Sequence, residues 1–332
     1  MSRPKVYLSR KLPQAAVDIV AATCDYRMWE SEEQPIPRDV LIRELQEADG
    51  ALVLLTLMWG VNWPMMKFSL GELTPMYFRA VTMSGGALLL LAFFVWRGVD
   101  MRLPWREASR VAWLALPNII GWHFFSILGL NELASGRAAI LGFTMPVWTV
   151  LIGALIMHER LHARVYVSIV AAITAVALLS AYELTALAGR PLGVLWMQFA
   201  AVCWAVGTLL MRRTRTSLPT EAVTVWMMML GAVFFWTAAL LAEPAPNWQF
   251  SAAMWGSLAY GVVLNYGYAQ ILWFSLAREL PPSASAFSLM AVPVVGTLSA
   301  TWIVGERPGW TDLAAIVFVT IAIASALLPR RA

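Results

Sequence analysis

The chain has 332 residues and a formal net charge of +4, with 60% hydrophobic and only 13% charged residues. An average soluble domain is about 25% charged, so the composition argues against a soluble protein and for an integral membrane protein. The positive charge does not indicate a nucleic-acid-binding protein, because the arginines lie at the ends of long apolar runs rather than in one basic patch.

The first 50 residues differ from the rest of the chain, with seven Lys/Arg against nine Asp/Glu. They contain no apolar segment of the kind found in a cleavable signal peptide. Their pattern is typical of a small α/β unit, which we expect to be cytoplasmic. The elements predicted in chain order are a strand at 5–10, a helix at 14–23, a strand at 26–30, a helix at 37–47 and a strand at 51–56.

Three segments of this region resemble the start of the D-2-hydroxyacid dehydrogenases, in particular the glyoxylate and hydroxypyruvate reductases. They are KVYLSRKLP at 5–13, WESEEQPIPR at 29–38 and EADGALVLLT at 47–56. That family's Gly-x-Gly-x-x-Gly motif and its catalytic His, Glu and Arg have no counterpart here, so we expect no dehydrogenase activity. We interpret residues 1–50 as a truncated fragment joined by gene fusion or by a misjoined reading frame. A regulatory appendage and an inert tail are the alternatives.

Ten uncharged runs follow, and each predicts one membrane-spanning helix, because about 17–25 apolar residues cross a bilayer core of about 30 Å. The segment 51–56 is a strand in the dehydrogenase interpretation and the start of the first span in the membrane interpretation. We expect a helix, since hydrocarbon cannot accommodate an unpaired strand. A soluble protein with ten buried helices of this polarity is the disfavoured alternative. The runs are 50–66, 80–96, 111–131, 138–158, 165–182, 191–211, 222–242, 252–276 after a loop at 243–247, 280–305 and 313–329.

The loop charges predict the orientation of these spans. The connections on the N-terminal side of the membrane carry twelve arginines, against five Lys/Arg on the other side. Because cytoplasmic loops are enriched in Lys and Arg, we expect a multi-pass protein of the inner (plasma) membrane with both termini in the cytoplasm.

The chain also contains an internal repeat, in which residues 134–160 and 281–307 align at an offset of 147. Identical residues stand at 139/286, 146/293, 147/294, 151/298, 156/303, 159/306 and 160/307, so both copies end in Glu-Arg. Five spans at 51–182 and five at 191–329 make two halves, and an odd number of spans gives them opposite polarity. The predicted fold is therefore an all-α polytopic membrane protein of ten spans, arranged as a 5+5 inverted repeat.

From residue 57 onward the chain resembles the drug/metabolite transporter superfamily, in particular its EamA-type permeases. The residues that carry the resemblance are WGVNWP at 59–64, PMYFR at 75–79, and the Ala-Ala…Pro…Glu-Arg pattern of span 4 with its echo in span 9. The resemblance implies a carrier of small metabolites, often an exporter of amino acids or related compounds. It also implies that the solute is held in a central cavity between the halves.

Candidate site residues come from polar and aromatic side chains inside the spans, since all eleven acidic residues after position 50 lie at or near span ends. Polar groups cannot face lipid without cost, so they should point into the bundle. There they either bond neighbouring helices or line the solute cavity, and both interpretations stay open. Asn118 and His123 lie 147 residues before Asn265 and Gln270, which favours the cavity for these pairs. The candidates are Asn62, Trp63, Asn118, His123, Thr144, Trp148, Asn265, Tyr266, Tyr268 and Gln270.

The predicted function is transport of small metabolites by alternating access, with export of amino acids or related solutes favoured. No enzyme activity, cofactor, metal site or nucleic-acid partner is expected. The expected partners are a small solute and the lipid bilayer, and a homodimer is left open. An oxidoreductase fragment on a membrane anchor and a non-transporting membrane scaffold or sensor are the alternatives. Several deep tryptophans would suit an amphipathic or cationic solute if they face the cavity.

Overall fold

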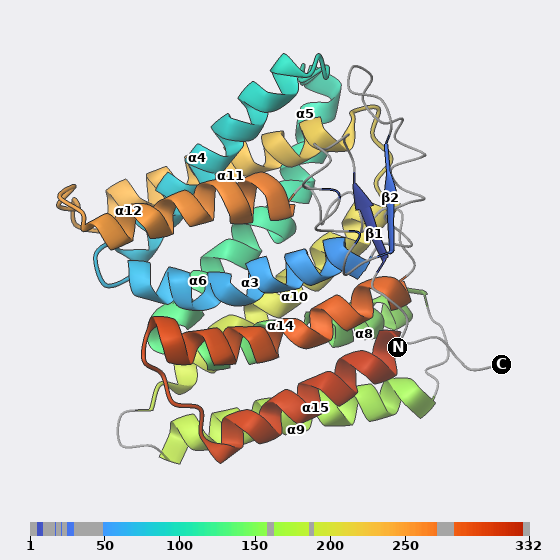
Figure 1. The fold of residues 1–332 in the computed structure, drawn as a ribbon, viewed down its shortest axis with the longest axis vertical. Helices are drawn as coiled ribbons and strands as arrows, with labels where there is room; N and C mark the ends of the chain where they lie inside the picture. The colour runs from blue at the N-terminus through green and yellow to red at the C-terminus, as the bar shows by residue number, and fades with distance from the viewer. Residues whose placement is uncertain are drawn as a thin grey trace.

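The computed structural model describes residues 5–8, 17, 21, 25–29, 49–157, 163–185, 189–270 and 282–327, and these are mostly helical (Figure 1). Strands β1 (Lys5–Leu8) and β2 (Asp25–Met28) pair in parallel, with Lys5 opposite Asp25. Two of the predicted strands are therefore confirmed over these residues. Val17 and Ala21 between them are helical, and the predicted helix at 37–47 lies outside the described residues.

The helices that follow coincide with the ten apolar runs. In the first half they are α3 (Asp49–Ser69), α4 (Pro75–Trp96), α5 (Trp105–Ala115), the π-helix η1 (Leu116–Gly121), α6 (Trp122–Glu132), α7 (Ser135–Gly142), α8 (Met145–Met157) and α9 (Ala163–Thr185). In the second half they are α10 (Pro191–Arg213), α11 (Thr220–Ala242), α12 (Ala252–Ala259), the π-helix η2 (Tyr260–Ala269), α14 (Pro282–Ile303) and α15 (Trp310–Leu327). The expected helix at 51–56 is confirmed as part of α3.

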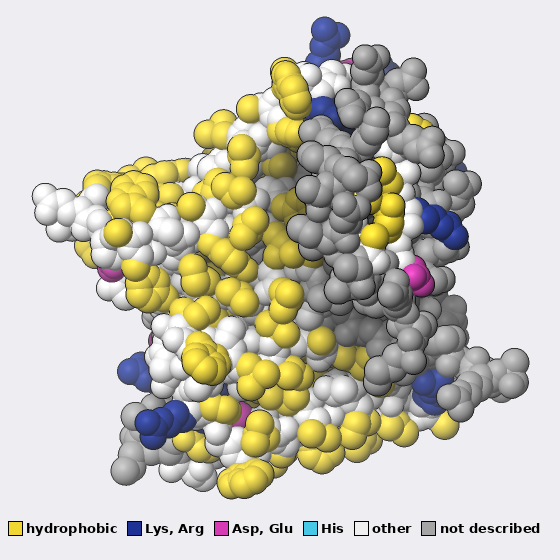
Figure 2. Space-filling view, viewed as in Figure 1, with side chains coloured by type: hydrophobic (Ala, Val, Ile, Leu, Met, Phe, Trp, Pro, Cys, Tyr) yellow, Lys and Arg dark blue, Asp and Glu magenta, His cyan; other side chains and the backbone are white. Residues whose placement is uncertain are grey.

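Within the described residues, six helical segments are long and apolar enough to cross a membrane. They are Pro75–Trp96, Trp105–Glu132, Ser135–Ile156, Ala163–Thr185, Pro191–Arg213 and Thr220–Ala242, and two shorter apolar helices cover Met290–Ile303 and Trp310–Ala326. Figure 2 shows hydrophobic side chains across the middle of the molecule, with most charged side chains toward the ends of the helices. Such a belt is the surface that a bilayer covers, so the chain is a multi-pass membrane protein. The count of ten spans stays a prediction.

Both halves carry a π-helix in their third helical segment. η1 at Leu116–Gly121 contains Asn118, and η2 at Tyr260–Ala269 contains Asn265, the residue 147 positions later. Pro117 explains the first one in part, because proline has no N–H for the α-helical ladder and forces a local rearrangement. π-helical segments are rare and often occur at functional sites, so both mark candidate positions for a site.

The helices extend beyond the uncharged runs at several ends. Helix α4 begins at Pro75, five residues before the uncharged run at 80–96, so Arg79 lies in its second turn rather than in a loop. The side chain of Arg79 is buried, with 2% of its surface exposed. Helix α7 likewise begins at Ser135 and takes Arg137 into its first turn.

Helices of the two halves pack closely on one another, with α3 against α14 and α4 against α11 (Figure 1). The closest approach of α3 and α14 is at Gly60, where a Cβ atom would lie 2.4 Å from Cγ1 and 2.6 Å from Cβ of Val295. Small residues at helix crossings allow such contact in membranes, where packing rather than hydrophobic burial drives association. Gly60 therefore sets the distance between these two helices.

We predict that Gly60→Ala destabilises the fold by about 1–3 kcal/mol, because the added methyl group must push the two backbones apart. Unfolding by SDS in mixed micelles measures the change. Gly256→Ala in α12 is the matched control, since no atom lies within 4 Å of its added methyl group. The control should be neutral or slightly stabilising. A Gly60→Ala variant as stable as the wild type would contradict the close packing of α3 on α14.

Candidate functional site

A cavity lies in the interior of the bundle, between elements of both halves. Its walls come from α3, α4, α6 and the α7–α8 turn of the first half and from α10, η2 and Gln270 of the second half. The lining residues are Trp59, Asn62, Trp63, Met66, Arg79, Trp122, His123, Ser126, Phe143, Met145, Trp204, Asn265 and Gln270. Among the described residues no acidic side chain lines it, and its charged side chain is that of Arg79.

The guanidinium of Arg79 has only neutral partners. Its Nη1 donates to the hydroxyl oxygen of Tyr266 at 3.0 Å, and its Nη2 donates to Oγ of Ser126 at 3.3 Å. Its Nε is buried and has no hydrogen-bond partner. Within the described residues no carboxylate lies within ion-pair distance of it. A buried cation without a counter-charge is costly, and inside a membrane protein such residues mark functional sites.

Tyr266 connects Arg79 to His123. The Tyr266 hydroxyl accepts from Arg79, so its own proton is free for Nδ1 of His123, 3.4 Å away. This arrangement favours the His123 tautomer with the proton on Nε2, because Nδ1 then serves as the acceptor. Nε2 is buried and has no partner in the structure. His123 thus presents an unused donor in the wall of the cavity.

Gln270 presents a second unused donor. It is 4% exposed, lines the same cavity, and its Nε2 is buried without a hydrogen-bond partner. Gln270 stands 147 residues after His123 and follows η2 as His123 follows η1. Buried amides and imidazoles are normally paired, so two unpaired ones in one cavity wall indicate groups kept for a ligand.

Four tryptophans form a continuous aromatic wall along the cavity. Trp59 lies edge-to-face with Trp204 at 6.3 Å between ring centroids, Trp204 contacts Trp122 at 4.9 Å, and Trp122 contacts Trp63 at 6.4 Å. These rings come from α3, α6 and α10, and all four line the cavity. Indole rings offer a large, stiff apolar surface at low entropic cost, which suits the body of an organic solute.

The structure brings five of the ten sequence-predicted site residues to this cavity: Asn62, Trp63, His123, Asn265 and Gln270. Tyr266 lies directly behind the wall, 1% exposed and bonded to Arg79. Asn265 is 6% exposed, so the two asparagines of the predicted pair are both buried but have different surroundings.

The other four predicted residues lie elsewhere. The Asn118 amide donates to the backbone oxygens of Leu114 at 2.9 Å and Gly207 at 3.2 Å, which ties η1 to α10. Thr144 and Trp148 both contact Gln198, with Trp148 Nε1 donating to its Oε1 at 3.1 Å, and they line a separate apolar groove. Tyr268 is 50% exposed on the outside of the bundle. The structure therefore gives these four no place at the central cavity.

Arg79 is the functional candidate that sequence reasoning missed, together with Ser126 beside it. Counting uncharged runs put Arg79 in the flank of span 2, because such a run ends by definition at the first charge. The available signal was Pro75, which is favoured in the first turn of a helix and places Arg79 inside it. Trp59, Trp122 and Trp204 were recognisable as deep tryptophans, but only the fold shows that they share one wall.

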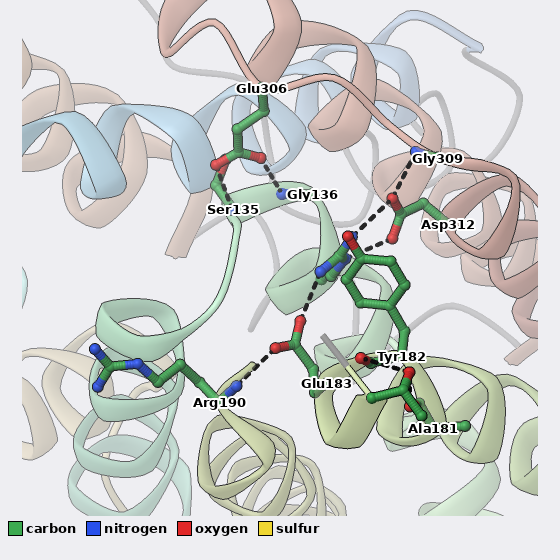
Figure 3. A network of polar contacts seen from close by, with 11 residues as sticks. Ser135, Gly136, Ala181, Tyr182, Glu183, Arg190, Glu306, Gly309 and Asp312 are labelled. Carbon is green, nitrogen blue, oxygen red and sulfur yellow. Dashed lines mark hydrogen bonds and ion pairs between the residues drawn. The ribbon is translucent and has the colours of Figure 1, made fainter. Parts of the chain in front are cut away.

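Polar contacts join the two halves near helix ends, where Glu306 approaches Ser135 and Gly136 (Figure 3). The Glu306 carboxylate after α14 accepts from the backbone N–H and Oγ of Ser135 at 2.7 and 2.9 Å and from the N–H of Gly136 at 3.1 Å. It thereby caps the N-terminus of α7, where free N–H groups and the helix dipole favour an anion. At the same end Lys67 donates to the backbone oxygens of Leu130 and Asn131 at the end of α6.

Arg137 joins three elements at this end. Its Nη1 lies 2.6 Å from Oε1 of Glu183 in α9, and its Nε lies 2.7 Å from Oδ1 of Asp312 in α15. Its guanidinium carbon stacks over the Tyr182 ring at 3.8 Å. The side chains of Glu183 and Asp312 are only 6% and 5% exposed, so two nearly buried carboxylates depend on one arginine.

We predict that Arg137→Met lowers the free energy of unfolding by about 3–5 kcal/mol, since it leaves two buried carboxylates without their counter-charge. SDS unfolding of the purified variant measures the loss. Arg190→Met is the matched control: Arg190 pairs with Glu132 at the same end, but its side chain is 64% exposed. An exposed pair contributes about 0–1 kcal/mol, so similar losses in both variants would contradict the role given to Arg137.

Comparison with known proteins identifies relatives over almost the whole membrane region. The model of the EamA-like transporter family matches the chain twice, over residues 47–181 and 191–328. Both matches lie after residue 46, so the dehydrogenase resemblance of the N-terminal region gains no support from them. A solved crystal structure shares the fold with a TM-score of 0.61 at 22% identity, covering 83% of this chain and 96% of its own.

Three curated relatives show the same extent of similarity. The transporter YoaV of Bacillus subtilis (strain 168) is 22% identical over 83% of this chain and 92% of its own. The inner membrane transporter YedA of Escherichia coli (strain K12) is 24% identical over 85% and 92%. A protein of the same strain named "Probable amino-acid metabolite efflux pump" is 24% identical over 83% and 94%. The relatives are thus named as transporters and not as enzymes.

Proposed function

Because this chain belongs to the EamA-like transporter family, we propose that it is a secondary transporter that moves small organic solutes through the cavity between its two halves. The observation that carries the proposal is the unpaired polar wall of that cavity: Arg79 Nε, His123 Nε2 and Gln270 Nε2 are all buried and unused. Structural hydrogen bonds between helices would satisfy these groups, whereas a transported solute must find them free.

Ten spans in two inverted halves are the arrangement that we propose for this transporter. The two family matches support the duplication, and the π-helices η1 and η2 at equivalent positions support it independently. The inverted polarity rests on five helical segments in each half and on the loop charges. We place the protein in the inner membrane with both termini in the cytoplasm, and the YedA relative supports the membrane assignment.

Alternating access then follows from the repeat. Glu306 of the second half caps α7 at its N-terminal residues Ser135 and Gly136, and we infer that this contact holds one end of the cavity closed. The residues 147 positions away are Glu159 and the start of α14 at Pro282. We infer that Glu159 caps the start of α14 in the alternate state, in which the opposite end of the cavity is closed. Each half then contributes one carboxylate that holds an end of the cavity closed, here called a latch, and the two latches form in alternation.

Amino acids or related metabolites are the solutes that we propose, with export as the direction. The relative named as an amino-acid metabolite efflux pump supports this class. A wall of four tryptophans beside hydrogen-bond donors fits solutes that combine an apolar body with a polar group. A small solute and the surrounding lipid are then the partners of the protein.

Solute counterflow in proteoliposomes tests the function. The purified full chain is expected to exchange at least one member of a panel of labelled amino acids and organic cations. We predict that Asn265→Ala in the cavity wall slows this exchange by about two- to tenfold, the value of one hydrogen bond. Tyr268→Ala on the same π-helix is the control, because Tyr268 faces outward, and it should leave the rate unchanged. Absence of flux for every solute tested would refute the proposal.

A second experiment tests the latch. Met66 lines the cavity near the Glu306 end and is 3% exposed, so Met66→Cys, with Cys24 and Cys203 replaced by Ser, should react slowly with an impermeant maleimide. We predict that Glu306→Gln raises this rate about tenfold, because losing the charged cap shifts the population toward the state open at that end. Glu132→Gln, which removes a partly exposed charge at the same end, should leave it unaltered. Equal rates in all backgrounds would exclude Glu306 as a latch.

A further inference from the structure

We propose that Arg79 binds the carboxylate of the transported solute, so that the cavity selects organic carboxylates whose apolar body lies against the tryptophan wall. This inference rests on the proposed transport function and names the chemical class that the site accepts.

The charge of Arg79 is the first argument. Its guanidinium carries a positive charge, and the described residues offer it a phenol and a hydroxyl but no carboxylate. Arg137, whose side chain is 14% exposed, is by contrast neutralised by two carboxylates. The same chain therefore pairs its structural arginine and leaves the cavity arginine unpaired. A solute carboxylate is the missing counter-charge.

The free donors are the second argument. A carboxylate accepts about four hydrogen bonds through two oxygens, and an arginine can meet both oxygens with its planar fork. Nε of Arg79 is unused, and Nε2 of His123 and Nε2 of Gln270 are unused in the same cavity. All three are donors once the Tyr266 hydroxyl proton faces Nδ1 of His123. A set of donors without an anionic acceptor selects an anion.

The tryptophan wall is the third argument, and the charge of Arg79 decides which kind of solute this wall suits. On their own, Trp59, Trp63, Trp122 and Trp204 would suit an organic cation as well as an apolar group. A guanidinium in the same cavity repels a cation, and no acidic side chain among the lining residues attracts one. The indoles are therefore the site of the solute's apolar body, with the carboxylate turned toward α4.

Binding of four matched probes to the purified full chain at pH 7.5 tests the proposal by isothermal titration. The probes share a phenyl ring: 3-phenylpropanoate has a carboxylate, phenylalanine adds an ammonium, 3-phenylpropanamide has no charge, and 2-phenylethylamine has only an ammonium. We predict that the two carboxylates bind at least tenfold more tightly than the amide and the amine. Sodium chloride titrated into the same protein distinguishes an organic carboxylate from a simple anion.

Substitutions of Arg79 test whether this residue causes the tighter binding of the carboxylates. Arg79→Gln should weaken 3-phenylpropanoate about 10- to 100-fold, the range expected for a charged hydrogen-bonded contact, and leave 3-phenylpropanamide unchanged. Arg79→Lys should restore part of the loss, and Tyr268→Ala, which lies outside the cavity, should stay within threefold of the wild type. Arg79→Gln should also unfold no more easily than the wild type, because it removes a buried charge without a counter-ion. If Arg79 had only a structural role, its replacement by Gln would make the protein unfold more easily than the wild type.

Three outcomes overturn the proposal while leaving transport intact: tighter binding of the amine than of the carboxylates, equal binding of all four probes, or occupancy by chloride alone. A protein that exchanges solutes in counterflow but binds none of the probes also overturns it. If Arg79→Gln does not fold, the ranking of the four probes on the wild-type protein decides. Absence of any counterflow is a failure of the transport function itself, and the binding data separate the two.

Discussion

A polar group inside a lipid bilayer must find its partner within the protein, and this constraint organises the structure. Carboxylates near the ends of the helices are used as caps or ion-pair partners: Glu306 accepts from the start of α7, and Glu243 accepts from Thr74 and the first N–H groups of α4. Polar side chains in the interior bond to the backbone, as Asn118 does when it donates to the backbone oxygen of Gly207. Against this background, unpaired donors stand out. In the described part of the chain, three of the buried unpaired side-chain atoms belong to the wall of one cavity.

The two π-helices explain how that wall is built. A π-helical turn widens the helix and shifts the side chains that follow, so His123 after η1 and Gln270 after η2 reach one cavity from opposite halves. Asn118 and Asn265 are equivalent in the repeat and both lie in π-helices, yet only Asn265 of the two lines the cavity. The repeat therefore fixes the backbone more strictly than the side-chain environment, as expected when the two halves together bind a solute that has no two-fold symmetry of its own.

Hydropathy and repeat spacing predicted the position of nearly every helix, because each run of 17 or more uncharged residues leaves the backbone no other way to satisfy its polar groups. The site was predicted only in part. The offset of 147 selected His123, Asn265 and Gln270, which share the cavity, but also Asn118, which does not. Arg79 was not predicted as a site residue, because a charge marks the edge of an uncharged run. Helix α4 nevertheless begins before that run, at Pro75, and includes Arg79. Which face of a span points inward depends on packing between distant helices, such as α4 against η2, and spacing along one helix does not reveal it.

Arg79 also lies where solute binding can act on the motion of the two halves. Its contact with Tyr266 joins α4 of the first half to η2 of the second, and Tyr266 in turn meets His123 of the first half. A carboxylate bound at Arg79 would therefore lie at the interface between the two halves rather than within one of them. Such a ligand favours whichever arrangement brings donors from both halves around it, and it disfavours an arrangement that separates them. Coupling between solute and access then requires no carboxylate in the middle of the membrane, in agreement with acidic residues that lie at or near span ends.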